Sequence, residues 1–380
     1  MALREVVEAT APSGQRSCVL GTIAFSSGQL GEAEQRFSQA LEQARNDPDS
    51  QPLAALAANR LAGTYTLLGE GDKVLLTAEQ GFSAAEIHSR RYERPLLHLA
   101  AGCVPAGRGA AEEAARHARR AEEEAASLDY GQERVYAAMA RALVHQASGD
   151  YLGMADALGP WRDGSALDGR SRVYAVLWRP LLIEGLIGSG QVDQAAAALD
   201  QLRADSGQVG YLRPALAWLE GWLAEQRGAV DEARQIYRGS EDSVSSGSPV
   251  YAARLLLAHG RLLRRTGSRK DAVERLRRAN ALFGGLRAAP FAARVEAELA
   301  ACHLPGNPAK KQSALALTSR ETEVAHLVGR GVSNPEIAAE LYISRKAVEY
   351  HLSNIYAKCG LPGRQALRRY VEQWRQPAAV

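Results

Sequence analysis

Cysteine is scarce in this sequence: there are four cysteines in 380 residues, and no two have the spacing of a zinc site or a CxxC pair. We therefore expect reduced thiols, as in a cytoplasmic protein. Long hydrophobic runs are also missing. The longest stretch without a charge, from Ser17 to Gly31, is too short to cross a bilayer and contains several polar residues. The N-terminal residues lack an apolar core followed by a cleavage site, so we predict no secretory signal and no membrane span.

Motifs of the common enzyme classes are missing as well. Neither HExxH nor GxSxG occurs, the histidines of the body are scattered, and its runs of acidic residues resemble solvated helix faces. The string nearest to a phosphate-binding loop runs from Gly102 to Gly109, with Arg108 in place of the lysine that grips phosphate. We therefore predict that the chain is not an enzyme and that it binds no cofactor and no metal.

The alternating pattern of β-strands is not found either, whereas a helical pattern repeats along the body. Each repeat has an apolar helix-like run, a glycine-centred break and an alanine-rich segment. The breaks lie at Gly28, Gly69, Gly107, Gly149, Gly190, Gly228 and Gly267, with successive spacings of 41, 38, 42, 41, 38 and 39 residues. In four units an alanine follows five residues after the glycine: Ala33, Ala195, Ala233 and Ala272. We expect the glycine to end one helix and the alanine to let the next helix pack closely.

This arrangement resembles tetratricopeptide (TPR) repeats, although the period is longer than the usual ~34 residues. The resemblance extends from Cys18 to Leu286, and a final helix from Pro290 to Ala301 is expected to cap the stack. It implies an all-α, TPR-like helical-repeat solenoid whose concave face binds a protein partner or an effector. The alternative is a scaffold that has no ligand of its own.

Charge is distributed unevenly along the chain. Residues 309–380 carry 11 basic and 6 acidic side chains, a net charge of +5, whereas residues 1–308 carry 35 and 37, a net charge of −2. A basic end on a nearly neutral body favours an anionic partner for that end, although a solvated helix surface gives the same count. The Pro- and Gly-containing segment between these parts is typical of a linker. We predict a repeat region over 1–304, a linker over 305–316 and a DNA-binding domain over 317–380.

The first part of the tail has the signals of two short helices. Thr318 and Glu321 form a capping-box pattern at the start of the first helix. Asn334 is predicted to cap the second helix, with Pro335 at its first helical position. The predicted core residues of these helices are Val324, Leu327, Val328, Ile337, Ala338 and Leu341.

Two further helices are predicted beyond this pair. Ser344 is expected to cap the third helix, and Gly360 to end it. A buried stripe along the third helix is formed by Val348, Leu352, Ile355 and Cys359, which are spaced three or four residues apart. A fourth helix begins near Arg364. Two helices joined by a short turn, the second with a polar outer face, are typical of a helix-turn-helix that binds the major groove.

The segment from Leu317 to Arg364 closely resembles the LuxR-type C-terminal DNA-binding domain. The matching residues are Leu317, Thr318, Arg320, Glu321, Glu323, Val324, Gly331, Ser333, Asn334, Glu336, Ile337, Ala338, Leu341, Ile343, Ser344, Val348, His351, Asn354, Ile355, Tyr356, Lys358, Gly360 and Arg364. The resemblance implies a four-helix domain that binds promoter DNA as a homodimer. In such a domain the third helix enters the major groove and the fourth helix pairs the subunits.

The resemblance also implies which side chains contact DNA. The residues expected to face base edges are Glu349, Tyr350 and Ser353. Those expected mainly to hold phosphates are Arg345, Lys346, Asn354 and Lys358, with Arg364 in the same DNA-binding set and with Asn334 and Ser344 donating from helix N-termini. Glu349 stands where relatives often have lysine. Phosphate repels this carboxylate, but it can accept a hydrogen bond from cytosine N4.

Some residues of the tail have two open interpretations. His351 lies beside the buried stripe, where it is either a hydrogen-bonded structural residue or a base contact. Tyr370 and Trp374 either pack within the domain or form the dimer face. Lys310 and Lys311 are either solvated linker charges or additional phosphate contacts.

TPR-like repeats followed by a LuxR-type domain resemble the C-terminal half of the large ATP-binding LuxR-family regulators. Those proteins have an N-terminal nucleotide-binding module, and the motif GxxxxGK[ST] does not occur here, so we hypothesise that this chain is a fragment or a truncated relative. We predict a bacterial, cytoplasmic transcription regulator that associates with the nucleoid when bound to DNA. The alternative is a protein-interaction scaffold with a helix-turn-helix that does not bind DNA.

Overall fold

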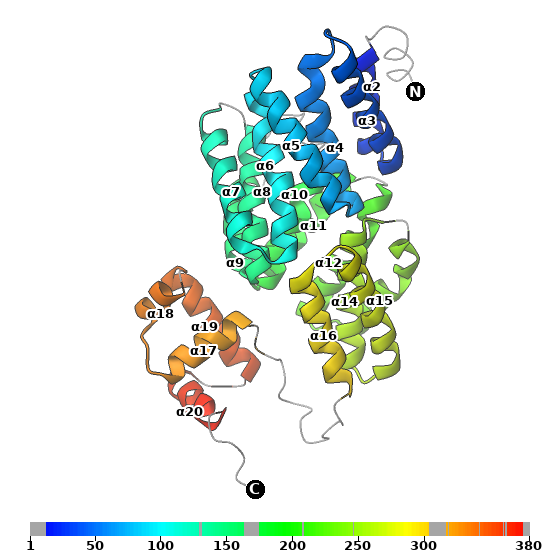
Figure 1. The fold of residues 1–380 in the computed structure, drawn as a ribbon. Helices are drawn as coiled ribbons and strands as arrows, with labels where there is room; N and C mark the ends of the chain where they lie inside the picture. Colours follow the sequence, from blue (N-terminus) through cyan, green and yellow to red (C-terminus); the bar gives the residue numbers. More distant parts are fainter. Residues whose placement is uncertain are drawn as a thin grey trace. The chain divides into compact units, whose positions relative to one another are not determined.

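The structure, a computed structural model, describes residues 13–128, 131–162, 175–206, 209–245, 247–303, 317, 319–341, 343–359, 361 and 363–374. All regular secondary structure in these ranges is helical, which confirms the predicted all-α fold (Figure 1). The chain forms two units, Met1–His303 and Leu304–Val380. Among the described helices, none combines the length and the apolar character that a membrane span needs.

The first unit is a series of helix pairs, as the repeats predict. The pairs are α2 (Ser13–Ser26) with α3 (Leu30–Asn46), α4 (Ala54–Leu68) with α5 (Gly71–Ile87), α6 (Arg94–Arg108) with α7 (Ala111–Ala126), and α8 (Gly131–Ser148) with α9 (Tyr151–Leu158). They continue with α10 (Ala175–Gly188) and α11 (Val192–Ser206), α12 (Arg213–Gln226) and α13 (Val230–Gly239), α14 (Pro249–Arg265) and α15 (Arg269–Gly285), and then α16 (Ala289–His303). Short 3₁₀ turns lie in the connections: η1 (Gln51–Leu53), η2 (Arg91–Glu93), η3 (Gly159–Trp161), η5 (Gly210–Leu212) and η6 (Glu241–Val244).

A left-handed glycine ends the first helix of each of these pairs. The glycines are Gly28, Gly69, Gly109, Gly149, Gly190, Gly228 and Gly267, with φ between 75° and 94°. After each of them, the next amide donates a hydrogen bond to the carbonyl five residues earlier, as in a Schellman motif. The predicted break at Gly107 is therefore wrong. Gly107 lies within α6, and the bond from the Ala110 amide to the Pro105 carbonyl places the left-handed residue at Gly109.

The second helix of each pair is anchored by the fifth residue after the glycine. These residues are Ala33, Val74, Ala114, Met154, Ala195, Ala233 and Ala272, and none is more than 2% exposed. A second small-residue position, which the repeat pattern did not reveal, lies seven residues before the glycine. A β-carbon at Gly21, Gly102, Gly221 or Gly260 would crowd Phe37, His117, Tyr237 or Leu276 of the paired helix. In these four pairs the second helix has an alanine at the anchoring position, so close packing depends on small residues on both helices.

Replacing Gly221 with alanine is expected to destabilise the first unit by about 1–3 kcal/mol, because the new methyl group overlaps the ring of the fully buried Tyr237. Gly63 is the matched control. It also lies inside a helix, but a β-carbon there would meet no neighbouring side chain within 4 Å, so alanine should add about 1 kcal/mol of helix propensity. Urea unfolding of the two variants measures the difference. Equal shifts of the two midpoints would contradict the close-packing account.

The later helix pairs pack back against the turns of the earlier ones. Ser248, at the start of α14, is buried, and its hydroxyl donates to the carbonyl of Leu67 over 2.7 Å. Arg287 forms an ion pair with Asp72 at 3.2 Å. Leu286 lies against the turn at Gly69. The C-terminal pairs of the array therefore lie against the turn between α4 and α5, a contact between distant repeats that the sequence pattern did not predict.

A buried ion pair lies in the core of this array and joins helices from different pairs. Arg254 of α14 lies 2.6 Å from Glu184 of α10, and the two side chains are 7% and 4% exposed. The guanidinium group lies between two aromatic rings, 4.8 Å from the centre of Trp218 and 4.6 Å from that of Phe291. Gln146 of α8 donates a hydrogen bond to the second oxygen of Glu184. Five helices, α8, α10, α12, α14 and α16, thus meet at one charged pair.

The second unit has the four predicted helices, α17 (Ser319–Gly329), α18 (Asn334–Glu340), α19 (Arg345–Cys359) and α20 (Arg364–Trp374) (Figure 1). Its core is formed by Val324, Ala325, Leu327, Val328, Ile337, Val348, Leu352, Ile355, Leu367 and Val371. The predicted stripe along the third helix is confirmed, because Val348, Leu352 and Ile355 are buried and Cys359 packs beside them. This small core gives α19 a fixed support of its own.

Candidate nucleic-acid interface

The start of α18 is capped by Ser333, so the predicted cap at Asn334 is wrong. The backbone of Ser333 is extended, and its amide and hydroxyl both donate to the carboxylate of Glu336, over 2.8 and 2.6 Å. Hydrogen bonds from the Ser333 side chain and backbone hold the pKa of Glu336 below its usual value. The capping box needs an acid three residues after the cap, and only Ser333 has one. Asn334 and Pro335 therefore occupy the first two helical positions.

Asn334 and Arg364, both predicted DNA contacts, are brought together by the fold. Arg364 Nη1 donates to Asn334 Oδ1 over 2.6 Å, and Nη2 donates to the carbonyl of Val332. The first residue of α20 thus holds the N-terminus of α18. The amide nitrogen of Asn334 is not used in this bond and can still donate.

The N-terminus of α19 is capped as predicted. The Ser344 hydroxyl accepts a hydrogen bond from the Ala347 amide over 3.1 Å. Arg320 of α17 donates to the carbonyl of Leu341, in the turn that precedes α19, and pairs with Glu323 at 2.7 Å. The turn between α18 and α19 is therefore held from two sides.

The outer face of α19 carries most of the predicted contact residues. Arg345, Lys346, Glu349 and Ser353 are exposed, and Tyr350 and Asn354 are half-buried. They are spaced so that they lie on one side of the helix, opposite the buried stripe. The side chain of Lys358 lies outside what the structure describes, as do Thr318, the side chain of Trp374 and residues 304–316 with Lys310 and Lys311.

One ion pair lies on this face. Arg345 Nε is 3.1 Å from Glu349 Oε1, with side chains 71% and 51% exposed. Because both groups are in water, the pair is weak, and either group can exchange its partner for a ligand. Glu349 therefore offers a negatively charged acceptor within a mainly basic and polar surface.

Two ambiguous residues are placed on the inner side of the domain. His351 is 4% exposed, and its ring centre lies 5.7 Å from that of Tyr350, which favours the structural interpretation over a base contact. Tyr370 is half-buried and packs against the core, so at least part of its ring serves the domain itself.

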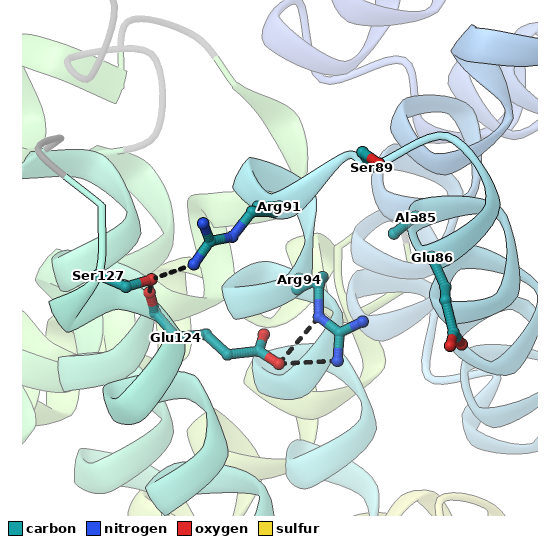
Figure 2. A pocket seen from close by; sticks show the side chains of 7 residues that line it. All are labelled: Ala85, Glu86, Ser89, Arg91, Arg94, Glu124 and Ser127. Carbon is teal, nitrogen blue, oxygen red and sulfur yellow. Dashed lines mark hydrogen bonds and ion pairs between the residues drawn. The ribbon is translucent and has the colours of Figure 1, made fainter.

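The first unit has a shallow pocket of about 280 Å³ where α5, η2 and α7 meet. Figure 2 shows Arg91 extending toward Ser127, which follows α7, and Arg94 extending toward Glu124 of α7. Arg91 donates to the Ser127 hydroxyl over 3.0 Å, and Arg94 donates to the Glu124 carboxylate over 2.8 Å. Both guanidinium groups are thus engaged by the walls of the pocket. In the described part of the chain, no cluster of His, Cys, Asp and Glu is arranged to hold a metal ion.

Comparison with known proteins identifies the second unit. Residues 315–371 match the family described as bacterial regulatory proteins, luxR family. Over 53 residues the chain is 47% identical to the spore germination protein GerE of Bacillus subtilis, which covers 14% of this chain and 72% of that protein. The chain belongs to the LuxR family. The match includes α17, α18 and α19 and reaches Val371 of α20.

Other LuxR-type relatives are similar over the same short region. An HTH-type transcriptional regulator of Mycobacterium tuberculosis is 47% identical over 51 residues, which are 13% of this chain and 6% of that protein. The oxygen regulatory protein NreC of Staphylococcus aureus is 41% identical over 54 residues, 14% of this chain and 25% of that protein. The matched region thus spans a small part of these relatives. A solved tetratricopeptide repeat protein from Parabacteroides merdae overlays 77% of this chain and 99% of that chain, with 14% identity and a TM-score of 0.40.

Proposed function

We propose that this DNA-binding regulator recognises promoter DNA sequence-specifically, with α19 in the major groove. The surface of α19 carries the proposal: a polar and basic face lies opposite a buried stripe, within a LuxR-family domain. A helix presented in this way by a capped partner helix is the recognition helix of helix-turn-helix proteins. In this proposal the functional regions are 1–304, the linker 305–316 and the DNA-binding domain 317–380.

The contact residues divide into two groups. Those proposed to face base edges are Glu349, Tyr350 and Ser353. Those proposed to hold phosphates are Arg345, Lys346, Asn354, Lys358, Ser344 and Asn334, while Arg364 contributes by holding Asn334 and α18 in place. Phosphate contacts fix the position of the domain on the duplex, and base contacts determine which sequence it prefers.

Two further parts of the proposal rest on the family resemblance. The protein is proposed to bind DNA as a homodimer paired through α20. The repeat array is proposed to bind a protein partner or a small effector, in keeping with its helix pairs. The second candidate function is a scaffold that does not bind DNA, and the Arg345–Glu349 pair, which partly neutralises the α19 face, is the observation that favours it.

A salt titration of DNA binding by the full chain tests the proposal. One duplex pool is random, and the other is selected for binding from a randomised library. We expect a linear fall of the logarithm of affinity with the logarithm of salt concentration, and an enriched motif in the selected pool. Binding without an enriched motif would contradict sequence-specific recognition. Absence of binding at low salt by the folded protein would favour the scaffold.

A further inference from the structure

Later helices of the first unit pack against the glycine turns of earlier pairs, and they do so in a regular order. In three places a residue near the start of a helix contacts a glycine turn five repeats earlier: Val209 at Gly28, Pro249 at Gly69 and Pro290 at Gly109. The N-terminal end of a later helix therefore meets the C-terminal end of an earlier one. In this arrangement the two helix dipoles attract each other.

The contact at Gly28 buries an aromatic ring. Tyr211 in η5 is 2% exposed, and its ring centre lies 6.3 Å from that of Phe25 at the end of α2. Leu30, the first residue of α3, is buried and belongs to the same hydrophobic cluster. The start of a later helix thus covers apolar side chains on both sides of the glycine turn.

The sequence around Tyr211 occurs a second time, at the start of α6. Residues 211–214 read Tyr-Leu-Arg-Pro and residues 92–95 read Tyr-Glu-Arg-Pro, and each tyrosine lies 17 residues before the left-handed glycine of its pair. Each tyrosine is also the middle residue of a 3₁₀ turn, η5 or η2. However, α6 belongs to the third described pair, so no described turn lies five repeats before it. Tyr92 is accordingly 52% exposed.

The other half of the Gly28 contact also has an exposed counterpart. Val230 is the first residue of α13 and follows Gly228 by two residues, as Leu30 is the first residue of α3 and follows Gly28 by two. Val230 is 38% exposed, and a β-carbon at Gly228 would meet no described atom within 4 Å. The turn at Gly228 therefore has the features of the turn at Gly28 without the helix start that covers it.

We propose that the repeat arrays of two copies of this chain associate head to tail, with Tyr92 of one copy packed against the turn at Gly228 and Val230 of the other. A second copy is the occupant because each copy presents both halves of a contact that the chain already makes between η5 and the turn before α3. The contact is not symmetric, so each copy can use both of its halves and assemblies can grow beyond a dimer. The area covered is small, so the association is weak.

The charges at the two sites are complementary. Residues 91–97, which form η2 and the first turn of α6, have a net charge of +1. Residues 223–233, from the last turn of α12 to the first turn of α13, have a net charge of −2. Some of these charges already have partners in the array, such as Arg94 with Glu124 and Asp231 with Arg234. The helix dipoles and the apolar contact therefore contribute alongside a modest electrostatic attraction.

The experiment measures self-association of the full chain by analytical sedimentation over a range of protein concentrations, without DNA. Tyr92→Ala removes one half of the contact, and Val230→Glu removes the other with a residue that suits the first turn of a helix. Leu76→Ala is the matched control, because it removes a 59% exposed apolar side chain of α5 that has no place in the contact. Tyr92→Phe keeps the ring. Circular dichroism checks that every variant is folded.

Wild type should form species larger than a dimer as its concentration rises, and both Tyr92→Ala and Val230→Glu should associate at least 10-fold more weakly, as expected for a central aromatic anchor and its seat. The Leu76 and Tyr92→Phe variants should match wild type. An equimolar mixture of Tyr92→Ala and Val230→Glu should associate more strongly than either variant alone at the same total concentration. One protein in this mixture retains the tyrosine and the other retains the intact turn.

Several outcomes would overturn the inference. One is a wild-type chain that forms nothing larger than a dimer, which would leave room for the second unit of the same chain to cover Tyr92 or Val230. Another is a mixture that associates no better than the single variants, since a head-to-tail contact must be restored by it. A Leu76 variant as weak as Tyr92→Ala would indicate unspecific apolar association. Pairing through α20 yields at most a dimer, and no DNA is present, so failure of the proposed function would not alter these results.

Discussion

The R345A/K346A variant should bind every duplex about 100-fold more weakly than wild type at about 0.1 M salt, because each phosphate contact contributes about tenfold under those conditions. Both residues are exposed on α19, and neither belongs to the core of the domain. The loss should be the same for random and selected duplexes, since phosphate contacts do not distinguish sequences. Removing Arg345 also leaves Glu349 without its ion-pair partner, which adds repulsion from the backbone.

Glu349→Gln is the contrasting variant. It removes a negative charge, so binding to random duplexes should strengthen while discrimination between sequences falls by about 1–3 kcal/mol at one base pair. A carboxylate accepts from cytosine N4, whereas an amide pairs with adenine, so the preferred base at that position should shift from cytosine toward adenine. Lys73→Ala, which removes an exposed charge from α5, is the control and should change neither property. An unchanged base preference in the Glu349 variant would contradict its role in reading bases.

Replacing Glu184 with alanine is expected to lower the free energy of unfolding of the first unit by about 3–5 kcal/mol. The change leaves the Arg254 guanidinium buried without its partner, 2.6 Å from where the carboxylate was. The rings of Trp218 and Phe291 attract the cation but cannot replace the carboxylate as an acceptor of its hydrogen bonds. In the variant, no carboxylate therefore offsets the free energy that the Arg254 guanidinium loses when folding removes it from water.

The double variant Glu184→Leu/Arg254→Met distinguishes this cause from a simple loss of packing. Apolar residues of similar volume remove both charges together, so its stability should be close to that of wild type or higher. Glu296→Ala, on α16 and away from this pair, is the matched control and should have little effect. Urea unfolding of the three variants provides the comparison. A double variant as unstable as Glu184→Ala would contradict the explanation based on an unpaired charge.

Many features of this protein could be predicted because their causes lie within a few residues along the chain. The glycine breaks were predicted at six of seven positions, since a helix end needs a left-handed residue and glycine adopts that conformation most easily. The buried stripe of α19 and its Ser344 cap likewise follow from local spacing. The two local errors are also small. Gly107 and Asn334 are within two residues of the correct Gly109 and Ser333, where the hydrogen bonds of a Schellman motif and a capping box decided between neighbours.

The contacts between distant segments could not be predicted in this way. Ser248 donates to a carbonyl 181 residues earlier, and Gln146 reaches Glu184 across 38 residues. No local pattern marks either pair, because each depends on the angle at which successive helix pairs stack. The same holds for Arg364, whose partner Asn334 lies 30 residues away on a different helix.

The sequence by itself thus determined the helices, their pairing, the repeat period and the family of the second unit, because hydrogen bonds and apolar spacing within a helix or a turn are local. Only the tertiary structure decided how the C-terminal helix pairs pack against the earlier ones, which charges are buried together and which basic residues stay exposed. These features depend on the packing of helices that are far apart in the chain.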